Sequence, residues 1–167
     1  AIDGLFAVSI TLMLAENTSL ANAVLGGGIL LAFRHVGEAL AAPLFGRLAD
    51  RFGALKIFII SATLTVVGLL LIAFNEVVLG AIILLIFRGA IASLGPTIIA
   101  QRFDAKEIVL DNLARVQSWR DLGVAAGPMV TGFALLYCSA ELQHLIFAIS
   151  FGMALAFSSS KICSNLK

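Results

Sequence analysis

Hydrophobic residues fall into six long segments along the chain, and short polar or charged stretches separate them. A helix needs about 20 apolar residues to cross a bilayer, and five of the six segments come close to that length. None of them alternates apolar and polar positions as barrel strands do, so helices are the expected spanning form. The predicted spans are residues 2–15, 22–45, 57–74, 77–100, 122–140 and 145–160. The pattern predicts an all-α integral membrane protein with a six-transmembrane-helix bundle over residues 1–160 and a tail at 161–167.

The composition agrees with a membrane protein and excludes several other classes. Hydrophobic residues make up 60% of the chain and charged residues 13%, whereas soluble domains carry about 25% charged residues. A net charge of +1 without a basic stripe argues against nucleic-acid binding, and the expected partner is the lipid bilayer. The two cysteines, Cys138 and Cys163, lack the spacing of a metal site or a disulfide framework. We therefore predict neither a metal nor a cofactor.

The basic residues indicate how the chain crosses the membrane. Arg34 and Arg88 lie within predicted spans, and the remaining nine of the 11 Lys and Arg residues follow the second, fourth or sixth span. These nine are Arg47, Arg51, Lys56, Arg102, Lys106, Arg115, Arg120, Lys161 and Lys167. The alternate connections carry Glu16, Glu76 and Glu141 and no basic residue. Because Lys and Arg mark the cytoplasmic side, we predict a multi-pass protein of the plasma membrane (a cell inner membrane) with a cytoplasmic C-terminus.

The connection at residues 101–121 is unusually long and polar, and we expect it to be cytoplasmic. Apolar residues recur near helical spacing at Ala105, Val109, Leu113 and Val116, and Asp111 and Arg115 stand four residues apart. This pattern favours an amphipathic helix that either lies against the bundle or extends the fifth span. A plain linker is the alternative.

Residues 46–56, between the second and third spans, read GRLADRFGALK. Gly46 and Gly53 suit a short turn between antiparallel helices, because glycine tolerates backbone conformations that other residues avoid. Asp50 is favoured near the positive end of a helix, where neighbouring arginines can pair with it or with lipid phosphates. Taken alone, this segment is a cytoplasmic hairpin with basic anchors.

The same pattern, G-R-L-A-D-R-x-G after a second span, resembles the signature loop of the major facilitator superfamily. The resemblance covers the whole chain and implies half of a major facilitator fold, which moves a small solute by alternating access together with a missing other six-helix half. It also implies a gating contact between the halves, made by Gly46, Arg47, Asp50, Arg51 and Gly53. Ala54 and Leu55 depart from the family's second basic cluster, which leaves only Lys56.

The weakened motif and the short segment after the sixth span are more typical of the family's C-terminal half. We therefore expect these spans to correspond to the seventh to twelfth of a complete transporter. In the family, the first and fourth spans of each half line the cavity, and the second and fifth border the other half. The third and sixth face lipid, and in this chain those two spans carry no charge.

Glycine and proline interrupt two of the spans. Gly95-Pro96 predicts a break in the fourth span, because proline removes a helix hydrogen bond. Gly123 and Gly127 form a face of small residues that permits close helix approach, and Pro128 predicts a bend. The complete set in these two spans is Gly95, Pro96, Gly123, Gly127, Pro128 and Gly132. Tight packing without a role in transport is the alternative.

Charged residues within the spans are candidates for function. Arg34 and Glu38 stand four residues apart on the second span, with His35 beside them, so one face can hold an ion pair. Arg88 on the fourth span has no acid nearby on its own helix, and Glu38 or Asp3 is its candidate partner. Such residues mark solute or ion pathways by default, although a packing network is the alternative. His35 and Glu38 make protons a candidate coupling ion.

Two other functional classes stay open beside a transporter. A non-transporting membrane component, or a truncated inactive half-transporter, would share the same composition. An intramembrane enzyme is the weaker alternative, because Ser93 has no nucleophile motif around it and no H-E-x-x-H zinc motif occurs. We predict that the chain is not an enzyme, and the sequence does not indicate whether its solute is imported or exported.

Overall fold

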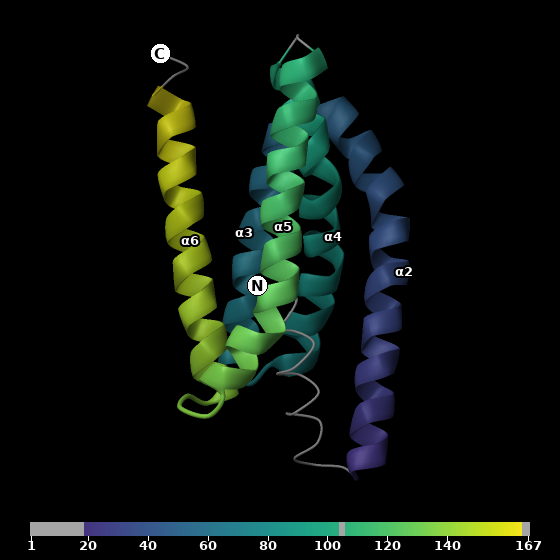
Figure 1. Cartoon of the computed structure of the whole chain (residues 1–167), viewed down its shortest axis with the longest axis vertical. Coiled ribbons are helices and arrows are strands. Elements are labelled where there is room, and N and C mark those ends of the chain that lie inside the picture. The colour runs from purple at the N-terminus through teal and green to yellow at the C-terminus, as the bar shows by residue number, and fades with distance from the viewer. Residues whose placement is uncertain (1–18, 104–105, 165–167) are drawn as a thin grey trace.

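The computed structural model describes residues 19–103 and 106–164 and places them in five helices, labelled α2 to α6 (Figure 1). Their bounds are α2 Leu20–Phe52, α3 Ala54–Ala73, α4 Val77–Arg102, α5 Lys106–Ala134 and α6 Ala140–Ser164. The described part contains helices and turns but no strand, which confirms the all-α prediction. The predicted first span, with Asp3, lies outside the described residues. The expected tail begins inside α6, which continues to Ser164.

Helix α2 is longer than the predicted second span. It has 33 residues and begins after Ser19, whose hydroxyl accepts a hydrogen bond from the Asn22 N–H at 3.4 Å. It ends at Phe52, and Gly53 alone separates it from α3. Gly53 has a φ of 94°, in the region that favours glycine, and its N–H donates to the Ala49 carbonyl at 2.8 Å. This single residue therefore both caps α2 and reverses the chain.

Helix α5 combines the polar connection and the fifth span in one element of 29 residues. The sequence left open whether this connection forms a helix against the bundle, an extension of the fifth span or a linker. In the structure, residues 106–121 extend the fifth span as the first part of α5. An ion pair at 2.9 Å between Arg115 and Asp111 lies on its exposed surface. The helix ends at Ala134, before the predicted end at residue 140, and the next five residues turn the chain into α6. The Leu142 N–H donates to the Ser139 hydroxyl at 3.4 Å at the start of α6.

Helices α3 and α4 form the centre of the bundle, and α2 and α6 lie on opposite sides of them (Figure 1). Gly68 of α3 faces Gly80 of α4, so closely that a Cβ on Gly80 would lie 2.7 Å from the Gly68 carbonyl oxygen. One core cluster joins α3, α4 and α6 through Leu69, Ile72, Ala81, Leu84 and Ala148. Helix α5 contacts α4 over a smaller area and is mostly exposed.

A second set of contacts joins α2 to α4. Ala41, Phe45 and Ala90 form a buried cluster, and the Phe45 and Phe87 rings meet edge to face with centroids 6.0 Å apart. Near the end of α2, Ala49 packs with Ala54 and Leu94. These contacts fix which residues of α2 and α4 face each other farther along the two helices.

Three of the described helices are long and apolar enough to cross a membrane: Ala54–Ala73, Val77–Arg102 and Ala140–Ser158. Large apolar side chains cover their outer faces, as Val78, Leu79 and Ile82 do on α4. Such surfaces suit a lipid environment, which satisfies no polar group.

The prediction that Gly95-Pro96 breaks the fourth span is wrong, because α4 continues through Pro96 to Arg102. Side-chain hydroxyls supply local hydrogen bonds in this turn. Ser93 donates to the Ala90 carbonyl at 3.0 Å, and Thr97 donates to the Ser93 carbonyl at 3.5 Å. Such bonds help membrane helices to tolerate proline. Helix α5 likewise continues through Pro128.

Candidate functional site

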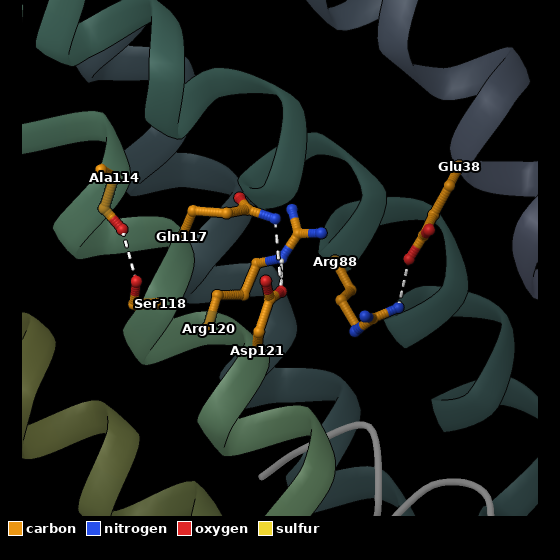
Figure 2. Close-up of polar contacts among 7 residues, drawn as sticks. All are labelled: Glu38, Arg88, Ala114, Gln117, Ser118, Arg120 and Asp121. Carbon is orange, nitrogen blue, oxygen red and sulfur yellow. Dashed lines mark hydrogen bonds and ion pairs between the residues drawn. The ribbon is translucent and has the colours of Figure 1, made fainter. Parts of the chain in front are cut away.

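An ion pair between two helices is the centre of the candidate site. The Arg88 guanidinium on α4 donates to the Glu38 carboxylate on α2 (Figure 2). The side chains are 19% and 27% exposed, so solvent screens this pair less than a surface pair. The backbone brings them together, because Gly89, next to Arg88, packs against Glu38; a Cβ on Gly89 would lie 3.3 Å from the Glu38 Cα. Glu38 was one of the two acids that the sequence offered as partners for Arg88.

The other members of the predicted charge network are placed less centrally. The His35 Nδ1 lies 3.9 Å from the second Glu38 oxygen, but the His35 side chain is 70% exposed. Arg34 lies in α2, and its side chain is outside the part that the structure describes. Asp3 lies outside the described residues altogether. The structure therefore brings together Glu38, Arg88 and His35.

A cavity of about 470 Å³ lies beside the ion pair, between α3, α4, α5 and α6. Its lining is mainly aliphatic and aromatic, and two arginines, Arg88 and Arg120, contribute the charged groups. The lining residues are Thr65, Arg88, Ile91, Ala92, Trp119, Arg120, Gly123, Phe147, Ser150, Phe151 and Ala154. Apolar walls with a few polar groups are typical of sites for small molecules.

The α5 wall of this cavity carries an exposed polar group (Figure 2). The Arg120 Nε lies 3.8 Å from an Asp121 carboxylate oxygen, and both side chains are more than half exposed. The Gln117 amide donates to the same Asp121 oxygen at 3.3 Å, one helical turn away. One turn earlier, the Ser118 hydroxyl donates to the Ala114 carbonyl at 2.9 Å. The hydrogen bond between Gln117 and Asp121 holds the carboxylate on the α5 surface.

The motif residues lie on a helix rather than in a loop, so the expectation of a turn at Gly46 is wrong. Phe45 and Ala49 are buried in the α2 packing, and the helix continues through the motif because its apolar face still has partners there. Arg47, Asp50 and Arg51 are exposed on the last two turns of α2. Four motif residues lie on α2, namely Gly46, Arg47, Asp50 and Arg51. Gly53 directly follows Phe52, the last residue of the helix.

The charged groups of the motif make few contacts with the described residues. The Arg51 guanidinium lies 5.3 Å from the centre of the Phe52 ring, a cation–π contact. Asp50 has no salt bridge within residues 19–103 and 106–164 of the structure. The sequence offered Arg47 and Arg51 as partners for this carboxylate, but neither pairs with it. The motif thus presents an acid and two bases at one end of the bundle.

Close helix approach occurs at glycines that the sequence analysis did not single out. Gly123 lines the cavity and Gly127 is buried, while an added Cβ at Gly95 or Gly132 would meet no described atom within 4 Å. The close approaches occur at the Gly68–Gly80 contact and at Gly89. Sequence spacing alone did not distinguish these positions, because the rotation of each helix decides which glycine faces a neighbour.

The structure also buries polar residues that the sequence did not single out. Thr131 of α5 lies beside α6, and the Gln143 side-chain amide donates to the Thr131 backbone carbonyl at 3.5 Å. His144 is fully buried on α6, and its Nδ1 lies 2.7 Å from the Ala140 carbonyl. Their position just before the predicted sixth span made Gln143 and His144 look like loop residues. Among the described residues, no group of three or more His, Cys, Asp or Glu side chains is placed to hold a metal ion.

Comparison with known proteins gives the family. The model of the family described as Major Facilitator Superfamily matches residues 1–159. The chain belongs to the major facilitator superfamily. The resemblance of the 46–53 motif is thereby confirmed, and the six-span pattern fits half of a major facilitator fold. A search of curated proteins and a search of solved structures each found no match.

Proposed function

We propose that this major facilitator chain is one six-helix half of a secondary transporter. It would move a small solute across the membrane by alternating access, together with another six-helix half. Family membership supports membrane transport in general. The observation that carries the specific proposal is the ion pair between Glu38 and Arg88, next to a cavity of about 470 Å³.

An ion pair at this place suits a transporter for an energetic reason. An unpaired charge in the middle of a membrane costs about 2.5–3.5 kcal/mol on insertion scales, so Glu38 and Arg88 each need a partner. The pair joins two different helices, α2 and α4. Any rearrangement that separates the helices must therefore supply new partners, such as water, solute or a proton on Glu38. This dependence links the conformation of the bundle to what enters the cavity.

The motif on α2 supports a gate that the two halves share. Gly46, Arg47, Asp50, Arg51 and Gly53 form the proposed gating set. Arg47, Asp50 and Arg51 are exposed at the end of α2, where Asp50 has no salt bridge with the described residues. In this proposal the motif contacts basic or helix-terminal groups of the other half and stabilises one access state.

Orientation, coupling and assignment of the half complete the proposal. The positive residues favour a protein of the plasma membrane with its C-terminus in the cytoplasm. Protons are the proposed coupling ion, because His35 lies 3.9 Å from the Glu38 carboxylate and is exposed. The weak second basic cluster after Gly53 favours the C-terminal half.

Transport by the complete protein tests the proposal. Uptake and efflux of radiolabelled sugars, amino acids and organic acids would be measured in cells, and the solute found would then be followed in proteoliposomes. Glu38→Gln and Arg88→Gln should each reduce transport strongly, because each leaves one charge unpaired. The double variant should be less impaired than the product of the two single effects.

The controls test whether transport requires the Glu38–Arg88 pair in particular or is sensitive to the loss of any charged pair. Neutralising the exposed Asp111–Arg115 pair on α5 should leave transport unchanged, because an exposed pair contributes about 0–1 kcal/mol. Asp50→Asn should reduce transport without reducing the amount of folded protein. Unchanged transport in both Asp50→Asn and Arg88→Gln would refute the site assignment. Absence of any transport by the unmodified protein would favour a non-transporting membrane component.

A further inference from the structure

The cavity between α3, α4, α5 and α6 has a chemical character that indicates its ligand. Its volume of about 470 Å³ lies within the range of about 300–1,000 Å³ that is typical of small-molecule sites. Phe147 and Phe151 of α6 and Ile91 and Ala92 of α4 contribute to its lining. These walls match a ligand with an apolar body of the size of an aromatic ring with small substituents.

The charges in the lining have a single sign. Arg88 and Arg120 line the cavity, and the described lining contains no acidic side chain. Arg88 already pairs with Glu38, which lies outside the lining. Among the described residues, the ion-pair partner of Arg120 is the adjacent Asp121, at 3.8 Å and with both side chains more than half exposed, and such a pair is weak. Arg120 is therefore the cation that an anionic ligand can engage.

We propose that this cavity binds a small organic anion with an apolar body, its acid group against Arg120 and its body against Phe147 and Phe151. A guanidinium holds a carboxylate or sulfonate through charge-assisted hydrogen bonds, which strengthen in surroundings of low polarity. A cation of the same shape meets two arginines and no acidic side chain in the described lining, so it should bind more weakly than the anion. This inference goes beyond the proposed transport function, because the cavity lies inside one half and its walls include α3 and α6, and binding is measured without transport.

Trp119 provides the reporter for binding. It is the single tryptophan of the chain and contributes to the cavity wall. The test adds 4-bromobenzoate to the purified protein in nanodiscs of neutral phosphatidylcholine, because a bromine atom quenches tryptophan fluorescence on contact. The matched probes are 4-bromobenzamide, which is neutral, and 4-bromobenzylammonium, which is a cation. Saturable quenching by the carboxylate, at least tenfold tighter than by the other two, supports the proposal.

Two variants with matched controls locate the site. Arg120→Gln should weaken binding of the carboxylate about tenfold, the value of a charge-assisted hydrogen bond, whereas Arg115→Gln on the same helix should not change it. Ala154→Phe should fill the cavity and abolish saturable quenching by all three probes. Ala156→Phe, at an exposed position outside the lining, should not. Circular dichroism confirms that each variant is folded.

The outcomes separate this inference from the transport proposal. Equal affinities for the carboxylate and the amide, or unchanged binding in Arg120→Gln, would overturn the anion site. Loss of quenching when phosphatidylglycerol replaces part of the neutral lipid would also overturn it, because the cavity would then hold an anionic lipid. Saturable, Arg120-dependent binding by a protein that transports no solute would keep the anion site and reject the transporter.

Discussion

The contact between α3 and α4 at Gly80 allows a prediction whose size follows from the structure. A Cβ on Gly80 would lie 2.5 Å from Ile72 Cγ1 and 2.7 Å from the Gly68 carbonyl oxygen. Neither atom can move away, because Ile72 is fully buried and the oxygen belongs to the backbone of α3. Gly80→Ala must therefore push the two helices apart, and overpacking of this kind costs about 1–3 kcal/mol.

The preference of helices for alanine opposes this loss. Alanine is favoured over glycine in a helix by about 1 kcal/mol, so the expected net loss for Gly80→Ala is about 0–2 kcal/mol. Gly46→Ala is the control, because Gly46 is helical and an added Cβ meets no described atom within 4 Å. It should gain up to about 1 kcal/mol.

The measurement is unfolding of the purified protein in mixed micelles as the fraction of dodecyl sulfate is raised, with helicity followed by circular dichroism. Gly80→Ala should unfold at a lower fraction of dodecyl sulfate than the unmodified protein, and Gly46→Ala at the same or a higher one. If the two variants shift in the same direction by the same amount, α3 and α4 do not approach each other at Gly80. The preference of helices for alanine over glycine would then explain both shifts, without a close contact between α3 and α4.

Three further predictions concern a turn, the orientation and a buried hydroxyl. Gly53→Ala should cost about 1–2 kcal/mol in the same unfolding assay, because a φ of 94° strains any residue with a Cβ; a shift no worse than that of Gly46→Ala would contradict this. A cysteine at Glu76 should react with a membrane-impermeant maleimide in intact cells and a cysteine at Lys56 only after permeabilisation, and the reverse labelling would refute the orientation. Ser61→Ala should leave stability unchanged or raise it by about 1 kcal/mol, because the Ser61 hydroxyl is buried without a hydrogen-bond partner in the described structure; a clear loss would show that the hydroxyl is bonded.

The sequence was informative about the ion pair because of the cost of a charge in lipid. Arg88 stands in a run of apolar residues, so it needed a partner, and few acids in the chain lie at a comparable depth. Glu38 was one of those acids, and it is the one that Arg88 contacts. The pairing of Arg34 with Glu38 stays a prediction, because the side chain of Arg34 lies outside the described part.

Helix ends and facing surfaces were harder to predict. The motif contains glycine and charged residues, which suggested a loop at Gly46, but the burial of Phe45 and Ala49 keeps α2 helical to Phe52. The glycines that bring helices together could not be chosen from spacing, because packing depends on how each helix is rotated. The cavity was equally out of reach, since its walls come from four helices.

Helix α2 carries both the ion pair and the motif on one continuous element. Glu38 and Asp50 are 12 positions apart, a separation of about 18 Å at 1.5 Å per residue. Pro43 lies between them and lacks the N–H that would bond to the preceding turn, so this is where the rod can flex. The helical segments on either side of Pro43 are stiff. A small change in the bend at Pro43 would therefore displace Asp50 and the neighbouring arginines at the end of α2 by a larger distance than residues close to the bend.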